Sequence, residues 1–307
     1  PYTTLFRSFS TSAPKQSSTP LKSGKFVWVL LLPGLLYLGM FFMIPLVSLL
    51  ITSVETPDPS GAIGMYQYGF DLASYQHVLV DYLPQILRSF GYAFVATVLA
   101  LLISYPLAYF VGIRLRSRPL IQKLTLTLVV APFFISFLLR TIAWKQIFAD
   151  DSVTMNFVRQ LLNLDPSYHF LGTPGAVVWG LVYNFIPFMT LPLYTSLERL
   201  DLRLLEAADD LYASPVAIFT KVTLPLTMPG VISGTLLTFI PITGDYVNAS
   251  RDFLGASDTS MIGNLVQADF LVNSDYPSAS AMSAVLMAVI LLIVTFYVRR
   301  TGTEDLL

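Results

Sequence analysis

Carboxylate side chains gather in one short stretch of an otherwise apolar chain. Glu206, Asp209 and Asp210 lie between Leu204 and Gly230, Asp201 precedes them, and three prolines interrupt the same stretch. No histidine or cysteine lies there, so its chemistry is that of ion pairs and not of nucleophiles or metals. A charged stretch of this kind between apolar ones is suited to docking on a soluble partner.

Two further charges lie within apolar segments. Asp245, in FIPITGDYVNAS, follows Pro241 and precedes Tyr246. A carboxylate beside an aromatic ring in a loosened helix suits a cationic amine, through ion pairing and cation–π contact. The alternative is that the helix ends sooner and water reaches Asp245.

Arg140, in FFISFLLRTIAW, is expected to snorkel to the outer membrane interface. A role in the solute pathway, or an ion pair with Asp245, is the alternative. Trp179 and Tyr183 belong to a set of aromatics at helical spacing, which could line a pathway or simply pack. Asp269 and Asp275 could meet the solute or the protein that delivers it, or could simply be solvated.

The cysteine, histidine and glycine–lysine patterns of the sequence argue against an enzyme site. There are no cysteines, and His77 and His169 lie far apart with no partner at metal-ligand spacing. The phosphate-binding pattern G-x-x-x-x-G-K-[ST] is absent, since the one Gly-Lys pair, Gly24-Lys25, is followed by Phe26. The sequence therefore predicts no catalytic residue, no metal and no cofactor in this chain. A net charge of −1 without basic runs also argues against nucleic acid.

The elements that must position these residues are membrane helices. The chain is 54% hydrophobic and only 12% charged, with a mean hydropathy of +0.66, whereas soluble domains carry about 25% charged residues. Six stretches approach the roughly 20 apolar residues that a spanning helix needs. They are residues 26–51, about 89–112, about 120–144, about 174–197, about 228–250 and about 280–298. We therefore expect an all-α, polytopic membrane protein with six transmembrane helices.

The distribution of basic residues predicts the orientation in the plasma (inner) membrane. Thirteen of the 18 Lys and Arg residues fall in the two termini and in the connections near residues 114–123 and 199–221. Because basic residues mark the cytoplasmic side, both termini and the stretch after Leu204 are expected in the cytoplasm. Residues 1–25 are rich in Ser, Thr and Pro and lack acids. They are expected to form a disordered cytoplasmic tail, with a transit peptide as the alternative.

The charged stretch predicts a helix, a turn and a second helix. From Leu197 to about Tyr212, apolar residues recur every three or four positions, as in an amphipathic helix. Ser214 followed by Pro215 is typical of a helix start, which predicts a second helix from Pro215 to about Val222. Thr227 is placed to cap the fifth span.

Six residues in this stretch follow a known pattern. The pattern consists of Glu206, Ala207 and Ala208, then position 212, then Leu224 and Pro225. With these fixed gaps it resembles the EAA motif of ABC importer permeases. The segments LPLTMPGVISG, GLVYNFIPFMTLPLYTSLERLD and MIGNLVQADFLVNSDYPSASA are similar to spermidine/putrescine permeases of the PotB and PotH type. The family glycine is Tyr212 here. Tyr adopts positive φ only at a cost of about 1–2 kcal/mol. Either Ser214-Pro215 closes the turn differently, or coupling to the ATPase through this subunit is weakened. We expect the turn to close differently.

The resemblance implies a type I ABC importer permease fold over residues 85–298, with a coupling loop at about 198–226 and a cytoplasmic tail at 299–307. It implies import of a polyamine by alternating access. The implied partners are a second permease in a heterodimer, two ATPase subunits that use ATP and Mg²⁺, and an extracytoplasmic solute-binding protein. The alternative is a stand-alone secondary transporter of a small cationic solute, which would use intramembrane charges as a relay.

Overall fold

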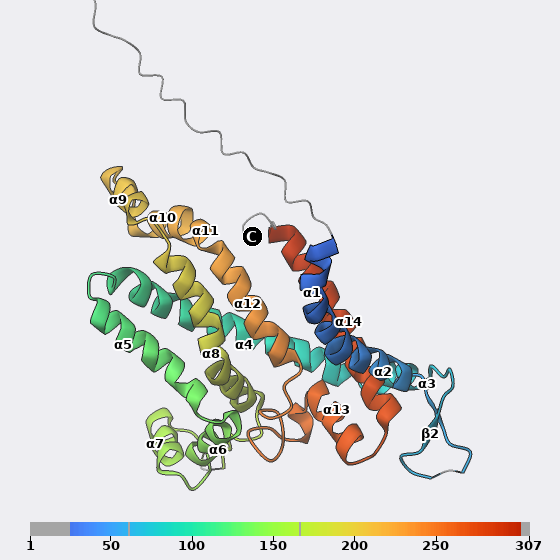
Figure 1. The fold of residues 1–307 in the computed structure, drawn as a ribbon. Helices are drawn as coiled ribbons and strands as arrows, with labels where there is room; N and C mark the ends of the chain where they lie inside the picture. Colours follow the sequence, from blue (N-terminus) through green and yellow to red (C-terminus); the bar gives the residue numbers. More distant parts are fainter. Residues whose placement is uncertain (1–24, 61, 166, 302–307) are drawn as a thin grey trace, which may run out of the picture. The chain divides into compact units, whose positions relative to one another are not determined.

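The computed structural model describes residues 25–60, 62–165 and 167–301, and this part of the chain is mostly helical (Figure 1). The expected tail, residues 1–25, and the end of the expected C-terminal tail lie almost wholly outside the described residues. The elements, in chain order, are α1 (Lys25–Leu38), α2 (Ile44–Thr52), β1 (Thr56–Pro57), β2 (Tyr66–Gln67), α3 (Ala73–Asp81), α4 (Leu83–Tyr109), α5 (Pro119–Val130), α6 (Phe137–Ile147), α7 (Val153–Leu162), α8 (Pro174–Glu198), α9 (Leu202–Asp210), α10 (Pro215–Ile218), α11 (Leu224–Leu226), α12 (Met228–Thr243), α13 (Ile262–Leu271) and α14 (Tyr276–Thr301).

The chain divides into two compact units at residue 48. The first unit contains α1, a π-helical turn at Gly39–Met43 and the start of α2. Its large apolar side chains, such as Trp28 and Phe42, are exposed. A helix with apolar residues on all sides is suited to lipid, and this segment agrees with the first predicted span.

The second unit is built around α4, α8 and α12, which pack side by side (Figure 1). Small residues allow the close approach: Ala93, Ala96 and Ala100 of α4 are fully buried. On α12, a Cβ atom at Gly230 would lie 2.8 Å from the backbone oxygen of Pro192 in α8. Only glycine therefore fits at this crossing.

Six spans are compatible with the structure, although two of them are bent. Four helical segments are each long and apolar enough to cross a membrane: Leu30–Thr52, Leu83–Arg114, Pro174–Glu198 and Tyr276–Arg299. Two further pairs of helices would each supply one more span, namely Pro119–Phe134 with Phe137–Ile147, and Pro215–Leu226 with Met228–Thr243. The all-helical expectation is confirmed.

The third and fifth predicted spans are wrong in detail. The third bends by 93° where Ile135 and Ser136 adopt extended backbone after a 3₁₀ turn at Ala131–Phe134. The fifth was expected to reach Ser250, but α12 ends at Thr243, and a connection without regular helix runs from Gly244 to Ala256. Asp245 therefore lies just beyond the helix instead of within it.

Candidate functional site

The charged stretch forms a protruding tip made of α9 and α10, residues 202–218, at the end of the second unit opposite α6, α7 and α13 (Figure 1). The expected continuous helix from Leu197 is wrong, because α8 ends at Glu198 and α9 begins after Asp201. The Asp201 carboxylate accepts a hydrogen bond from the Arg203 backbone N–H at 3.0 Å. This cap satisfies one of the unpaired donors of the new helix and explains the break.

Tyr212 adopts a left-handed backbone conformation, with φ +56°. The Tyr212 N–H donates to the Asp209 oxygen at 2.8 Å, and the Ala213 N–H donates to the Ala208 oxygen at 3.1 Å. This is the Schellman pattern that usually ends with glycine. The expectation that the turn closes differently is therefore wrong. The turn keeps the glycine-type conformation and carries the strain of a tyrosine.

The second helix starts where the sequence predicts but continues further. Ser214 accepts a hydrogen bond from the Ala217 N–H at 3.3 Å, and Pro215 occupies the first turn. Helical backbone then continues through Pro225 to Leu226, past the expected end at Val222. Thr227 does not cap α12 with its side chain. Its hydroxyl lies 2.7 Å from the Tyr105 hydroxyl and 2.8 Å from the Thr223 oxygen, which ties the base of the tip to α4.

The six motif residues divide between the tip and its base. Glu206, Ala207 and Tyr212 are exposed, and Tyr212 retains 98% of its accessible surface. Ala208 is half-buried, as is Leu224, which packs against the buried cluster of α4 and α8; Pro225 is exposed. Exposed Leu211 and Val216 add apolar surface beside the carboxylates. The tip thus presents a mixed apolar and acidic face.

Asp245 lies in a buried polar network at the other end of α12. The side chain is 7% exposed, and its carboxylate accepts hydrogen bonds from the Asn248 backbone N–H at 2.8 Å and from Asn248 Nδ2 at 3.1 Å. Asn184 Nδ2, on α8, donates to Asn248 Oδ1 and to Thr141 Oγ1 of α6, both at 3.2 Å. The alternative for Asp245 is right that the helix ends before this residue, but wrong that water covers it, because protein encloses the side chain.

No Lys, Arg or His within the described part of the chain forms an ion pair with Asp245. Hydrogen bonds, and not a cation, therefore hold this enclosed carboxylate within the described structure. Thr141, Asn184 and Asn248 were missed by sequence reasoning. The signal for Asn184 was present, because a polar amide within an apolar span usually has a partner.

Arg140 does not snorkel. Its side chain is 8% exposed, and its Nε and Nη1 atoms are buried without a hydrogen-bond partner among the described residues. The guanidinium lies 5.7 Å from the centre of the Phe137 ring. Within the described structure Arg140 forms no ion pair with Asp245 either, although its neighbour Thr141 belongs to the Asp245 network.

The predicted aromatic pathway residues are not gathered around Asp245. Trp179 and Tyr183 both pack edge-on against Trp144, with ring centres 5.2 and 5.1 Å away. The Tyr246 side chain is half-exposed, and its backbone oxygen accepts a hydrogen bond from Asn264 at 2.6 Å. Trp179 and Tyr183 therefore join α8 to α6. Asn184, which follows Tyr183, and Thr141 of α6 connect this region to Asp245 through Asn248.

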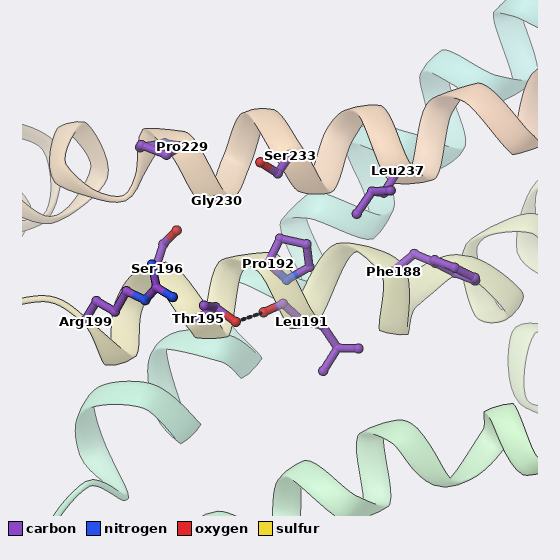
Figure 2. Close-up of a pocket in the computed structure, with 10 residues that line it drawn as sticks. All are labelled: Phe188, Leu191, Pro192, Thr195, Ser196, Arg199, Pro229, Gly230, Ser233 and Leu237. Atoms are coloured by element: carbon purple, nitrogen blue, oxygen red, sulfur yellow. Dashed lines mark hydrogen bonds between the residues drawn. The ribbon is translucent and has the colours of Figure 1, made fainter. Parts of the chain in front are cut away.

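A groove of about 440 Å³ runs along the crossing of α8 and α12, nearer the tip. Figure 2 shows the side chains of the two helices along it, from Phe188 and Leu237 to Arg199. Thr195, Ser196 and Ser233 supply hydroxyl groups and Arg199 supplies a positive charge, while the other lining residues are apolar. Sequence reasoning missed this groove, because it results from the crossing of α8 and α12. Phe188, which belongs to the same set of aromatics at helical spacing as Trp179 and Tyr183, lines the groove, whereas Asp245, Tyr246, Arg140, Trp179 and Tyr183 do not.

Comparison with known proteins connects this arrangement to a family. Residues 104–301 match the family of binding-protein-dependent transport system inner membrane components. The chain is 35% identical over 264 residues to the spermidine/putrescine transport system permease protein PotB of Escherichia coli K12, covering 86% of this chain and 93% of that protein. The chain belongs to the family of binding-protein-dependent transport system inner membrane components. The permease is also 34% identical to PotB of Haemophilus influenzae, over 86% of this chain and 90% of that protein.

The solved structures show the same fold. The permease matches a chain of a bacterial ABC transporter involved in alginate import with a TM-score of 0.70 and 16% identity, over 90% of this chain and 95% of that chain. A chain of the MetNI methionine ABC transporter gives a TM-score of 0.55 at 16% identity, over 71% of this chain and 94% of that chain. The permease is thus an inner-membrane ABC importer subunit with the type I fold.

Proposed function

We propose that the permease imports polyamines such as spermidine and putrescine. The observation that carries this proposal is its identity of 34–35% with PotB proteins over most of both chains. The enclosed Asp245 carboxylate, which lacks a cation partner in the described structure, supports a cationic solute. Arg140 is proposed to restrict where the cation can rest, since like charges repel.

The α9–α10 tip is proposed to couple solute movement to ATP hydrolysis in a partner. Glu206 and its neighbours would enter a groove on an ATPase subunit, which holds the ATP and Mg²⁺. The contacts of Thr227 with Tyr105 and Thr223 would transmit movement of the tip to α4 and α12. Coupling of this kind needs a rigid connection between two sites, and buried hydrogen bonds provide one.

The remaining parts of the importer are proposed from the family. A second permease would complete the transmembrane path, two ATPases would bind on the cytoplasmic side, and an extracytoplasmic protein would deliver the solute. The basic connections support an orientation with both termini in the cytoplasm. The tip would then face the ATPases, and Asp245 would lie near the outer membrane surface.

Uptake of radiolabelled spermidine by cells that lack other polyamine importers tests the solute. Cells with the complete importer are expected to accumulate spermidine, and Asp245→Asn is expected to reduce uptake at least tenfold with the permease still in the membrane. Asp252→Asn, which alters an exposed acid nearby, is the matched control. Unchanged uptake in Asp245→Asn would remove Asp245 from the pathway, and absence of uptake in all variants would contradict the polyamine proposal.

A further inference from the structure

Two carboxylates and three tyrosines meet at the end of the second unit opposite the tip. Tyr66 comes from β2, Tyr82 from the α3–α4 junction, Asp269 from α13, and Asp275 and Tyr276 from the start of α14. We call these five residues the Asp269 cluster. Tyr66 donates hydrogen bonds to the Ser274 backbone oxygen at 3.2 Å and to Asp275 Oδ1 at 3.4 Å, which brings the hairpin onto α14.

The Asp269 carboxylate has a hydrogen-bond partner on only one of its two oxygen atoms within the described structure. The side chain is 6% exposed, its Oδ1 atom accepts a hydrogen bond from Asn273 at 2.7 Å, and its buried Oδ2 atom has no partner in the described structure. Asp269 interacts electrostatically with Tyr66, Tyr82 and Asp275, which come from three other segments. The Asp269 carboxylate therefore lies within electrostatic range of these three segments.

Negative charge in the cluster is not balanced by a cation of this chain. No Lys or Arg of the described chain forms an ion pair with Asp269 or Asp275. Burial raises the pKa of the Asp269 carboxyl, and Asp275 raises it further, while the hydrogen bond from Asn273 and the nearby His77 oppose the rise. His77 is already paired with Asp81 at 2.5 Å.

The composition of the cluster selects one kind of ligand. An alkylammonium group has three N–H donors for the unpartnered Oδ2 and for the tyrosine hydroxyls. The ring of Tyr276, flanked by Tyr66 at 6.1 Å and Phe270 at 5.2 Å between ring centres, offers a cation–π surface. A metal ion fits less well, because the described residues contain no group of three His, Cys, Asp or Glu side chains that could hold one.

We propose that the Asp269 cluster binds a primary alkylammonium group. Two sources share this chemistry: a free amine solute, and a lysine side chain of the protein that delivers the solute. The link to transport rests on the proposed function, whereas the binding chemistry does not. Binding here would hold an amine at this end of the second unit before it reaches Asp245.

A site-specific label tests the binding. The assembled importer carries 3-fluorotyrosine at position 276, and its ¹⁹F resonance is followed during titration with n-butylammonium, with neutral 1-pentanol as the control ligand. We expect a saturable shift with the ammonium alone. Asp269→Asn is expected to weaken binding at least tenfold, and Asp151→Asn, an exposed acid elsewhere in the connections, less than twofold.

A second variant guards against misfolding of Asp269→Asn. Asp275 Oδ1 accepts a hydrogen bond from the Ser278 N–H at 3.2 Å, which caps α14, and Asn caps equally well. Asp275→Asn thus removes a charge while keeping the helix start, and it is also expected to weaken ammonium binding. The proposal would be overturned if ammonium binding were saturable but equally strong in both variants. It would also be overturned if neither the free amine nor the delivering protein shifted the ¹⁹F resonance.

The sources are distinguished by a parallel titration with the solute-free delivering protein, before and after lysine acetylation, which removes the charge. A shift with free spermidine indicates the solute, and a shift that acetylation abolishes indicates a lysine of the delivering protein; either supports the site. If spermidine uptake fails while n-butylammonium still binds, the proposed function fails and the site stands. If uptake persists without ammonium binding, the reverse holds.

Discussion

The strain at Tyr212 can be measured by exchanging its side chain. Both Tyr212→Gly and Tyr212→Ala remove the exposed ring, but only glycine removes the Cβ atom that opposes φ +56°. The free energy needed to open the turn should be about 1 kcal/mol higher in the glycine variant than in the alanine variant. Hydrogen exchange at the Tyr212-equivalent and Ala213 amides should therefore be roughly fivefold slower in the glycine variant. Equal exchange in the two variants would contradict a strained turn.

Asn184 is the residue that joins three segments of the Asp245 network. Asn184→Ala should destabilise the permease by about 1–3 kcal/mol, because the Asn248 and Thr141 oxygens lose a buried donor. The thermal midpoint in detergent should fall, and spermidine uptake with it. Asn156→Ala, an exposed amide on α7, should leave both unchanged. A midpoint equal to that of the unmodified permease would show that the network is not stabilising.

Single residues were predictable where chemistry is local. Ser214 was expected to cap a helix and does, because a cap needs only its own neighbours. Arg140 was not predictable in the same way. Snorkelling assumes that water or lipid headgroups lie within reach, and only the packed structure shows that this side chain is enclosed.

At the scale of elements, the crossing of α8 and α12 depends on one glycine. Gly230→Ala would place a methyl group 2.8 Å from the Pro192 oxygen and 2.5 Å from Ser196 Oγ, so the helices must separate. We expect the free energy of unfolding to fall by about 1–3 kcal/mol, as at other overpacked sites. Thermal unfolding and size-exclusion chromatography of the purified importer would detect it.

Gly91→Ala is the matched control, because a Cβ atom at Gly91 would meet nothing within 4 Å. Within helix α4 this change should be neutral, or should stabilise by up to about 1 kcal/mol, since alanine loses less backbone entropy than glycine. Equal effects of the two substitutions would mean that close packing at Gly230 does not hold α8 against α12.

Helix locations were largely predictable from hydropathy, whereas breaks were not. In the apolar run through residues 120–144, Pro132 marks a place where a helix can kink, but hydropathy does not show that Ile135 and Ser136 become extended. The end of α12 at Thr243 was expected only as an alternative, because the residues beyond Asp245 remain partly apolar. Hydropathy reports burial in lipid or protein, and it cannot distinguish a continuing helix from an enclosed connection.

For the whole molecule, the tip and the Asp245 network lie near opposite ends of the same helix, α12. The sequence predicted the tip and Asp245. It did not predict the other residues of the network, or the hydrogen bonds from Thr227 to α4 and from Asn184 to Asn248, which depend on contacts between distant segments. A permease that works by alternating access needs both ends to move together. In the proposed mechanism, the tip couples solute movement to ATP hydrolysis.

Spermidine uptake by proteoliposomes with the complete importer tests this claim most directly. With ATP inside and the delivering protein outside, we expect Glu206→Lys to reduce uptake at least tenfold while the complex remains assembled. Glu206→Gln should be less affected, and charge reversal at exposed Asp151 should have no effect. Undiminished ATP-driven uptake in Glu206→Lys, or uptake driven by a proton gradient in vesicles that contain this chain alone, would contradict the account.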